Sequence, residues 1–421
     1  MSARLLTTFA ALLLASGAAA ANDERNEDPA DDRDDAWGDD WEEGEAGGLV
    51  WTGFVEGAAG WRWSGGENRD AMTLGELRAR AETRWDAGPF RLDFKGDLAW
   101  DAVADELDAK ARELAVSFRP AAPLDVKLGR QVLTWGTGDL LFLNDLFPKD
   151  FISFFAGRDE EYLKAPSDTL RATVFTPAVN VDVAWTPDFT PDEYLYGEPF
   201  PLFERRAPEP GGGELALRAF RTVGSTEYAA YGYRGRWKQP VGLRVDGTPW
   251  FPRLDVWGAS VRTGLQRGIF NAEFAWYDSR QDDDGSDPAV PNSQLRFLVG
   301  YEQELVRNLT GATQLYTEHV RDHGALIANS PAPEREPDAW RTVATLRLTH
   351  RALRDRLVSS LFAFVSPTDE DFYLRPSVTW RRDDHWSFSS GLNLLGGSSD
   401  HTFFGQLEDD SNAWLRARFN Y

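Results

Sequence analysis

The sequence predicts an all-β fold, a transmembrane antiparallel β-barrel of about 18 strands, with 16 strands as the alternative and one extracellular loop folded inward. Three observations predict it. Apolar and charged residues alternate with a period of two over most of the chain, as in strands that separate two environments. Seventeen Trp and 26 Phe stand in a polar chain of mean hydropathy −0.46. Short turns also alternate with longer loops, as in bacterial barrels.

The composition excludes several other classes of protein. The 421 residues are 42% hydrophobic and 27% charged, which is too polar for a bundle of membrane helices. A formal net charge of −23 argues against a nucleic-acid partner, because binding a phosphate backbone needs a basic surface. The lack of cysteine removes disulfide frameworks, thiolate metal sites and cysteine nucleophiles.

Residues 1–20 have the pattern of a secretory signal peptide. Arg4 supplies the positive start, residues 5–14 are the apolar stretch, and the alanines at 18–21 form a small-residue cleavage site. The alternative, an N-terminal membrane anchor, needs a longer apolar stretch. We therefore expect export of the chain, which fits a cell outer membrane of the Gram-negative type.

Residues 21–48 form an acidic segment that is predicted to be disordered in the periplasm. Thirteen Asp and Glu residues stand there against only Arg25 and Arg33. Three roles remain open for it: a solubilising leader, a docking strip for a cationic periplasmic partner, or a flexible gate at the mouth of a pore. The barrel itself is expected to occupy residues 49–421.

Two stretches, 73–85 and 90–101, show the alternation most clearly. In each, small and apolar residues occupy one face and charged residues occupy the other. A soluble sandwich would also bury one face of each strand. The ten-residue spacing of Phe90 and Trp100 favours a membrane, because a tilted strand of that length covers roughly 23–24 Å, close to the ~25 Å apolar band of outer-membrane barrels.

Carrying the same pattern along the chain predicts the positions of the strands. Short turns alternate with loops that are usually longer, and an even strand count puts both termini in the periplasm. The expected strands are residues 49–63, 73–85, 90–101, 109–119, 124–135, 168–176, 179–186, 214–223, 227–238, 253–264, 269–279, 293–305, 309–320, 340–350, 357–366, 371–382, 385–395 and 411–421.

The last strand carries an independent signal. Its apolar and aromatic residues alternate with polar ones, and the chain ends on Tyr421. This pattern resembles the C-terminal strand of outer-membrane proteins, which implies the barrel-assembly machinery as a partner that recognises Tyr421. Taken alone, an ordinary amphipathic edge strand would show the same pattern.

Basic residues on the polar faces are predicted to line the lumen and to set selectivity. Arginines that face carboxylates across a lumen create a transverse field that filters solutes by size and sign. The alternative is that these residues form cross-strand ion pairs that stiffen the wall. The predicted lumen residues are Arg78, Arg80, Arg84, Arg91, Lys95, Arg130, Arg171, Arg416 and Arg418.

Segment 124–167 has a glycine-rich strand end followed by an apolar stretch. Glycines at 129, 136 and 138 permit a bulge or a bend. The residues at 140–151 are too apolar for a solvated loop and too interrupted by polar residues to span a bilayer. We expect this stretch to fold into the lumen as a constriction that includes Asn144, Asp145, Phe147 and Lys149.

The strand end Gly129-Arg130-Gln131, followed by Trp135-Gly136, resembles the G-R-Q-x-x-x-W-G pattern of porin-type outer-membrane channels, the group around the alginate-export-like proteins. The resemblance is local. It implies a channel of the eighteen-strand class with a narrowed, charged lumen, and it does not fix the substrate.

These observations predict a porin-like channel for passive diffusion of small polar or anionic solutes, with the lipid bilayer and the solute as partners. The alternative is a structural barrel that encloses or docks a periplasmic or lipidated partner. No catalytic residue, metal site or cofactor is expected. No histidine is paired with a nucleophile in a catalytic pattern, and the acidic run at 282–287 is more typical of a solvated loop than of a calcium site.

Overall fold

A computed structural model describes residues 49–63, 71–197, 199–200, 202–203 and 205–421. The signal peptide predicted at 1–20 and the acidic segment predicted at 21–48 lie outside these residues. Leu49–Asn420 form one structural unit. Among the described residues, no helix has the length and apolar character needed to cross a bilayer.

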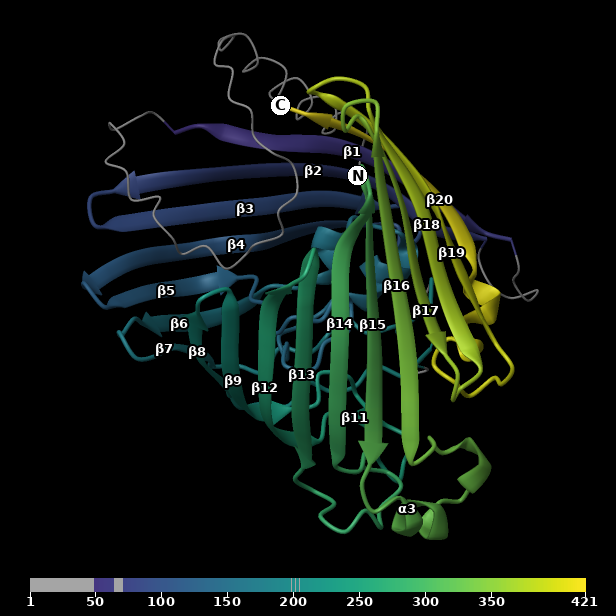
Figure 1. The fold of residues 1–421 in the computed structure, drawn as a ribbon. Coiled ribbons are helices and arrows are strands. Elements are labelled where there is room, and N and C mark those ends of the chain that lie inside the picture. Colours follow the sequence, from purple (N-terminus) through teal and green to yellow (C-terminus); the bar gives the residue numbers. More distant parts are fainter. Residues whose placement is uncertain (1–48, 64–70, 198, 201, 204) are drawn as a thin grey trace. The chain divides into compact units, whose positions relative to one another are not determined.

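Eighteen antiparallel strands form one closed sheet in this unit (Figure 1). Each strand pairs with the next along the chain, and pairing of the first with the last closes the barrel. The predicted 18-stranded barrel is confirmed, and the alternative of 16 strands is excluded. The strands are β1 (Trp51–Arg62), β2 (Met72–Ala87), β3 (Phe90–Asp101), β4 (Glu106–Ala121), β5 (Leu124–Gln131), β6 (Ser167–Val174), β7 (Asn180–Thr186), β8 (Glu214–Val223), β9 (Thr226–Arg236), β12 (Arg253–Leu265), β13 (Gly268–Ser279), β14 (Gln294–Val306), β15 (Leu309–Val320), β16 (Trp340–Ala352), β17 (Leu357–Ser366), β18 (Asp371–Arg381), β19 (Trp386–Gly397) and β20 (Asn412–Asn420).

The connections differ between the two ends of the barrel. At the end where β1 begins and β20 finishes, tight turns such as 88–89 and 266–267 join the strands. Gly88 has a φ of 62° in the first of these turns, a conformation that glycine adopts without steric cost. The opposite end carries long connections, including 132–166 and 187–213. These are called the short-turn end and the long-loop end.

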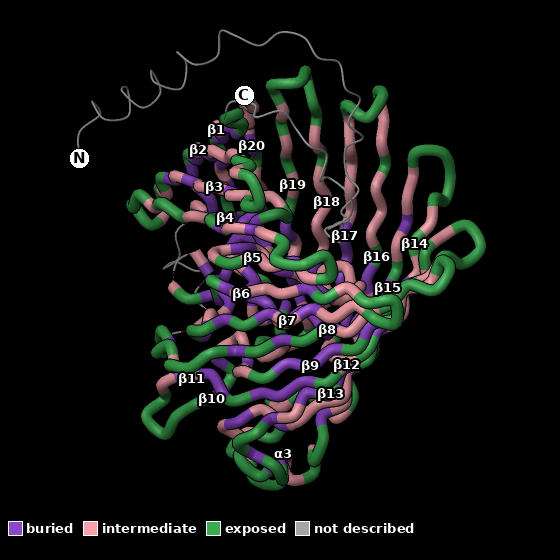
Figure 2. The backbone as a smooth tube through the Cα atoms, turned by 90° about the vertical axis from the view of Figure 1, so that its left-hand side faces the viewer, coloured by how far each residue is buried: buried purple, intermediate pink, exposed green. Residues whose placement is uncertain are grey.

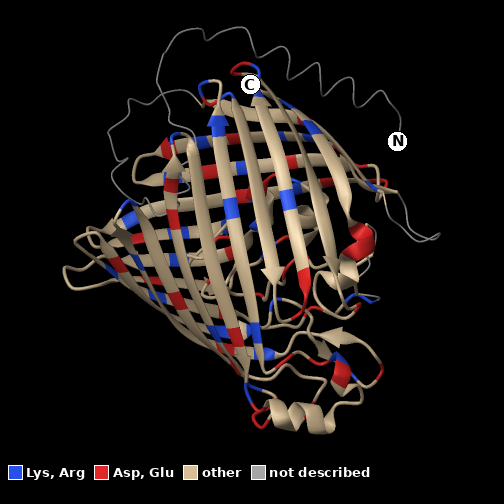
Figure 3. Cartoon of the chain, turned by 45° about the vertical axis from the view of Figure 1, so that its right-hand side comes forward, with Lys and Arg blue, Asp and Glu red and all other residues tan. Residues whose placement is uncertain are grey.

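The two faces of the wall have opposite polarity. On β2, Leu77 and Trp85 point outward and are 41% and 49% exposed, whereas Arg78 and Arg80 point inward and are 8% and 2% exposed. Buried and more exposed residues alternate along other strands in the same way, as β9 and β13 show in Figure 2, and charged residues recur along the wall in Figure 3. Apolar residues outside and charged residues inside are typical of a barrel that contacts lipid and encloses water.

Exposed aromatic residues gather near the two ends of the outward face. Such belts mark the two membrane interfaces of outer-membrane barrels. Near the short-turn end they include Trp51, Trp85, Phe90 and Trp380, and near the long-loop end Trp257, Trp276 and Trp340.

The long connections contain short elements that the alternation did not predict. They are helix α2 (Phe151–Ala156), helix α3 (His323–Asn329), the 3-10 helices η1 (Glu160–Leu163), η2 (Pro333–Arg335) and η3 (Gly405–Asp410), and a separate hairpin of β10 (Gly242–Leu243) and β11 (Pro249–Trp250).

β5 ends earlier than the sequence pattern predicted. The pattern continues to residue 135, but the last pair of β5 and β6 joins Gln131 to Ser167. The chain then leaves the sheet, and Trp135 packs edge-on against Phe147 with ring centroids 5.0 Å apart. Residue 135 is thus buried by its indole ring in the interior and is not paired in the sheet. The predicted strand 124–135 is therefore too long.

Candidate functional site

Residues 132–166, the inner segment, connect β5 to β6 through the interior of the barrel. Their side chains and backbone bond to strands on different sides of the wall, including β2, β13 and β20. A segment that reaches strands so far apart in a closed sheet must cross the lumen. Its charged residues therefore lie within the enclosed space.

Glu273 on β13 holds the start of the inner segment. Its Oε1 accepts hydrogen bonds from the hydroxyl of Thr137 and the backbone N–H of Gly138, both at 2.9 Å, and its Oε2 accepts one from the amide of Asn144 at 2.7 Å. Glu273 is only 4% exposed. A buried carboxylate with this many donors is well satisfied, and it fixes the segment to the wall.

Helix α2 carries the inner segment to the opposite side of the barrel. Phe155 packs on Tyr373 of β18 with ring centroids 5.2 Å apart. The carbonyl oxygen of Phe155 accepts hydrogen bonds from the side-chain amides of Asn393 and Asn412, at 2.9 and 3.2 Å. The helix ends at Gly157, where φ is 82°. These bonds satisfy the end of a helix that is buried in the lumen.

Four carboxylates of the inner segment meet basic side chains of the wall. Arg347 on β16 binds Asp139 at 2.6 Å and Glu160 at 3.2 Å, and the other two carboxylates, Asp159 and Glu161, meet arginines of β2 and β20. All four side chains are between 36% and 46% exposed. They therefore contact water as well as their arginine partners.

Arg78 and Arg80 face these carboxylates from β2. Arg80 binds Asp97 and Glu161, each at 2.7 Å, and also donates to the hydroxyl of Tyr162 at 2.8 Å. Arg78 binds Asp97 at 3.2 Å. The guanidinium carbons of Arg78 and Arg80 lie 4.3 and 5.0 Å from the centre of the Tyr162 ring. The inner segment thus supplies contacts to Arg78 and Arg80, two arginines predicted to line the lumen.

Glu161 stays ionised in this setting. Burial by itself would raise the pKa of Glu161, but the positive charges of Arg80 and Lys95 outweigh burial and lower it to about 2. The Nζ of Lys95 lies 3.2 Å from the carboxylate. The predicted lumen residue Lys95 therefore lies among the same charged residues as Arg80, and Glu161 keeps its negative charge at neutral pH.

Arg416 and Arg418 join the cluster from β20. Both bind Glu56 of β1, at 3.2 and 2.7 Å, and both reach Asp159, at 3.6 and 3.1 Å. Arg416 also donates to the carbonyl oxygen of Gly157 at 2.7 Å. Since β20 pairs with β1, residues from both ends of the barrel sequence meet the inner segment at one place.

Solved structures with a similar fold exist. OccAB1 of Acinetobacter baumannii matches with a TM-score of 0.53 at 9% identity, over 88% of this chain and 95% of that chain. OccAB3 of the same organism matches with a TM-score of 0.52 at 9% identity, over 89% of this chain and 99% of that chain. The chain has the same barrel fold as these two proteins. No protein-family model matches the sequence, and no curated protein matches it.

Three other predicted lumen residues lie away from the inner segment, nearer the short-turn end. Each pairs with a carboxylate of its own or the neighbouring strand, which is the geometry of a stiffened wall. The pairs are Arg84 with Asp93 at 3.0 Å, Arg91 with Asp86 at 2.9 Å, and Arg171 with Asp182 at 2.8 Å.

The structure corrects the placement of Arg130, which was expected in the lumen. Its cross-strand neighbour is Leu114, and both share the outward face with Leu128; these two leucines are 51% and 54% exposed. Arg130 pairs with Asp168 at 2.7 Å on that face. The side chains of β5 keep alternating between the two faces of the wall through Gly129. Gln131, which is 1% exposed, therefore points inward.

The four residues expected in the constriction are buried inside it. Asn144, Asp145, Phe147 and Lys149 are 2%, 5%, 7% and 3% exposed. Lys149 binds Asp145 at 2.9 Å and donates to the carbonyl oxygen of Phe147 at 2.8 Å. They hold the inner segment together, whereas Asp139 and the three carboxylates at 159–161 contact water.

Arg112 is a wall residue that sequence reasoning missed. Lys95 pairs with Glu113 and Gly96 with Ala111, so Arg112 between them forms a bulge in β4. Its guanidinium donates to the carbonyl oxygen of Glu161 at 3.0 Å. A bulge re-aims a side chain without changing the composition of the strand, so alternation alone does not reveal it. Three of the four water-exposed carboxylates of the inner segment could have been found from the sequence, because they form the acidic run at 159–161.

A second loop holds the inner segment from the long-loop end. Asp192 accepts hydrogen bonds from the backbone N–H of Lys149 and from the side chain of Gln239, both at 2.8 Å. Glu193 and Phe151 add backbone hydrogen bonds at 2.8 and 3.0 Å. Asp192 is 6% exposed. Burial raises the pKa of this carboxyl to about 6, although the nearby charge of Lys149 opposes the rise.

The free energy of unfolding should therefore fall as pH rises, because the Asp192 carboxyl loses its proton. Between about pH 4 and 6 the folded state binds a proton that the unfolded state releases, so the contribution is complete below pH 4 and is lost as pH rises through 6. We expect the unfolding free energy in urea to fall by about 2–3 kcal/mol more in the parent chain than in Asp192→Asn between pH 4 and 7. Parallel pH curves for the two proteins would contradict the assignment.

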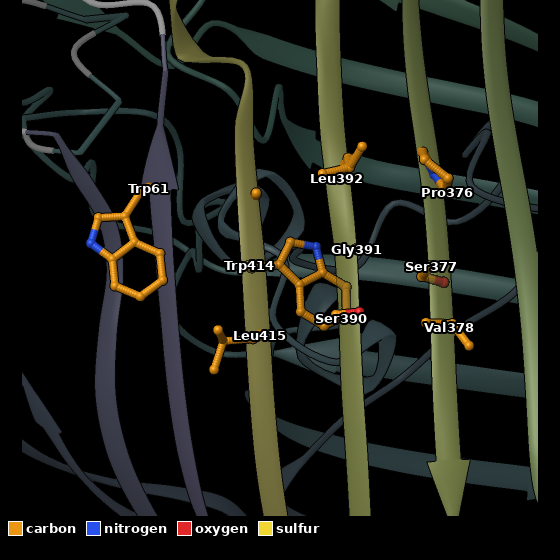
Figure 4. A pocket seen from close by; sticks show the side chains of 10 residues that line it. Trp61, Pro376, Ser377, Val378, Ser390, Gly391, Leu392, Trp414 and Leu415 are labelled. Carbon is orange, nitrogen blue, oxygen red and sulfur yellow. The ribbon is translucent and has the colours of Figure 1, made fainter.

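The outer surface has an apolar recess of about 500 Å³ between β18, β19, β20 and β1 (Figure 4). Trp61 and Leu415 border it, and Gly391 lies between them and Pro376. Pro376 has no N–H, and the pairing of β18 with β19 is interrupted beside it. The exposed residues that line the recess include Leu392 and Leu415, whereas the ring of Trp414 lies 5.2 Å from the guanidinium of Arg416. Within the described residues, no group of three His, Asp or Glu side chains is arranged to hold a metal ion.

Proposed function

We propose that this chain is an outer-membrane channel for passive diffusion of small polar or anionic solutes. One observation carries the proposal: inside a closed barrel with an apolar exterior, the inner segment sets water-exposed carboxylates against wall arginines. Opposed charges across a wet passage create a transverse field that orients polar solutes and weakly binds charged ones. Passage then needs no energy input and no catalytic group, so we propose a non-enzymatic role.

The charges of the cluster are balanced, nine basic against nine acidic side chains, which supports the passage of small polar solutes, and the wall arginines can also pair with anionic groups. The basic residues are Arg78, Arg80, Lys95, Arg112, Arg158, Arg347, Arg375, Arg416 and Arg418, and the acidic ones are Glu56, Glu76, Glu82, Asp97, Asp101, Asp139, Asp159, Glu160 and Glu161.

The proposed topology places the long-loop end outside the cell and both termini in the periplasm. The asymmetry of the turns supports it. In this arrangement residues 1–20 are the signal peptide, and residues 21–48 are a periplasmic segment that binds a partner there. Residues 49–421 form the barrel, and the barrel-assembly machinery recognises Tyr421. A relationship to the alginate-export-like group remains part of the proposal, supported by positive φ angles of 124° and 86° at Gly129 and Gly136.

Reversal potentials in planar bilayers test the proposal. In a salt gradient, Glu160→Gln combined with Glu161→Gln should shift the reversal potential toward stronger anion selectivity, because two water-exposed negative charges leave and the wall arginines remain.

The matched control is Asp86→Asn, which removes an exposed carboxylate near the short-turn end and should leave the reversal potential unchanged. A folded barrel that does not conduct would overturn the channel proposal. Equal selectivity of the double variant and the parent would overturn the role of the carboxylates.

A further inference from the structure

A row of arginines lies across β9, β12 and the residue that follows β13, on the outward face at the long-loop end. Arg253, the first residue of β12, lies directly opposite Arg236, the last residue of β9. On its other side, the backbone N–H of Arg280 donates to the carbonyl oxygen of Arg253 at 3.2 Å. Arg234 lies two positions before Arg236 on the same face of β9. Four guanidinium groups thus gather on one patch, the arginine row.

Two carboxylates neutralise only part of this row. Asp255 binds Arg234 at 3.0 Å, and Asp278 binds Arg280 at 3.2 Å, while Asp255 also lies 3.9 Å from Arg280. Within the described part of the chain, neither Arg236 nor Arg253 forms an ion pair. Arg236 donates to the backbone carbonyl oxygen of Phe251 at 3.0 Å. Like charges directly opposite each other on neighbouring strands repel, so an anion placed between them is stabilising.

The depth of the row along the barrel indicates what that anion is. The cross-strand pair of Trp257 and Trp276 lies on the same outward face, and these indoles are 56% and 39% exposed. Exposed tryptophans mark the boundary between acyl chains and headgroups. Arg253 is four residues beyond Trp257 on β12, about 13 Å along the strand or roughly 9 Å along the membrane normal for a tilted strand. That is the level of lipid headgroups.

We propose that the arginine row binds the phosphorylated headgroup of an anionic lipid in the outer leaflet. The planar fork of an arginine matches two oxygens of a phosphate, so Arg236 and Arg253 hold one phosphate between them. The acyl chains of the same lipid then lie against Trp257 and Trp276. The inference rests on the proposed membrane location, and it is independent of the lumen and of what passes through it.

Lipid binding to the folded barrel in neutral detergent tests the inference. The probes are lipid A with two phosphates and the same lipid after enzymatic dephosphorylation, followed by native mass spectrometry. The parent should bind the phosphorylated form in preference. Arg236→Gln with Arg253→Gln should weaken that binding by about fivefold or more, since two charge-assisted contacts are lost.

The matched control replaces Arg267 and Arg307, which are exposed in tight turns at the short-turn end, by Gln. It removes the same charge and should bind lipid A as the parent does. Equal binding of both lipid forms, or equal weakening in the control, would overturn the inference. Displacement of the lipid by inorganic phosphate alone would replace it by a free-phosphate site. Unchanged conductance of the Arg236 and Arg253 variant shows that the channel itself is intact.

Discussion

Removing the inner segment should raise the single-channel conductance several-fold. The variant deletes residues 133–165 and joins the strands with a short Gly-Ser linker, which is feasible because Gln131 and Ser167 already face each other at the ends of β5 and β6. The deleted residues cross the lumen from Glu273 to Asn393 and contain a packed aromatic core. Current through a wider passage meets less resistance, and planar-bilayer recordings measure it.

The control for this experiment shortens a different long connection. Deleting residues 324–336, which include most of α3, removes residues of the long-loop end that bond within their own loop and to Asp400. Its conductance should match that of the parent. Heat-modifiable migration on gels establishes that both variants are folded. A folded variant without the inner segment that conducts like the parent would show that this segment does not limit the passage.

Replacing Asp97 by Asn should cost about 3 kcal/mol of unfolding free energy, near the lower end for a broken buried ion pair. Asp97 is 5% exposed and binds both Arg78 and Arg80, so the change leaves two buried guanidiniums without their shared counter-charge. Urea unfolding of the reconstituted barrel measures the loss.

The comparison variant for this prediction is Asp86→Asn. Asp86 forms a single pair with Arg91, and its side chain is 63% exposed. Solvent screens such a pair, so its loss should cost less than about 1 kcal/mol. Equal losses for the two variants would mean that Asp97 does not balance the arginines of β2.

Most of the wall could be predicted from the sequence, because a strand with one face in lipid and one in water repeats its polarity every two residues. The expected strand 90–101 coincides with β3, and Arg78, Arg80, Arg416 and Arg418 lie on the inward face as alternation predicts. Arg130 lies outside the lumen because it stands two positions after Leu128 on the outward face of β5.

The interior was less predictable, because tertiary packing decides it. The apolar composition of residues 140–151 indicated burial, but it did not show which of them meet water. Asn144 and Lys149 are buried, while the exposed charges come from Asp139 and the acidic run at 159–161. The inward turn of Arg112 depends on a bulge, which has no signature in the residue types.

The pairing of β1 with β20 also restricts the register in which the barrel can close. Glu56 lies directly opposite Arg418, and two residues further along the seam Ala58 lies opposite Arg416. Sliding β20 along β1 by one residue would turn both arginines toward the hydrocarbon and remove both from Glu56. Charged side chains on the lipid face of a barrel cost about 2–4 kcal/mol each at the midplane. β20 thus has one energetically acceptable alignment on β1.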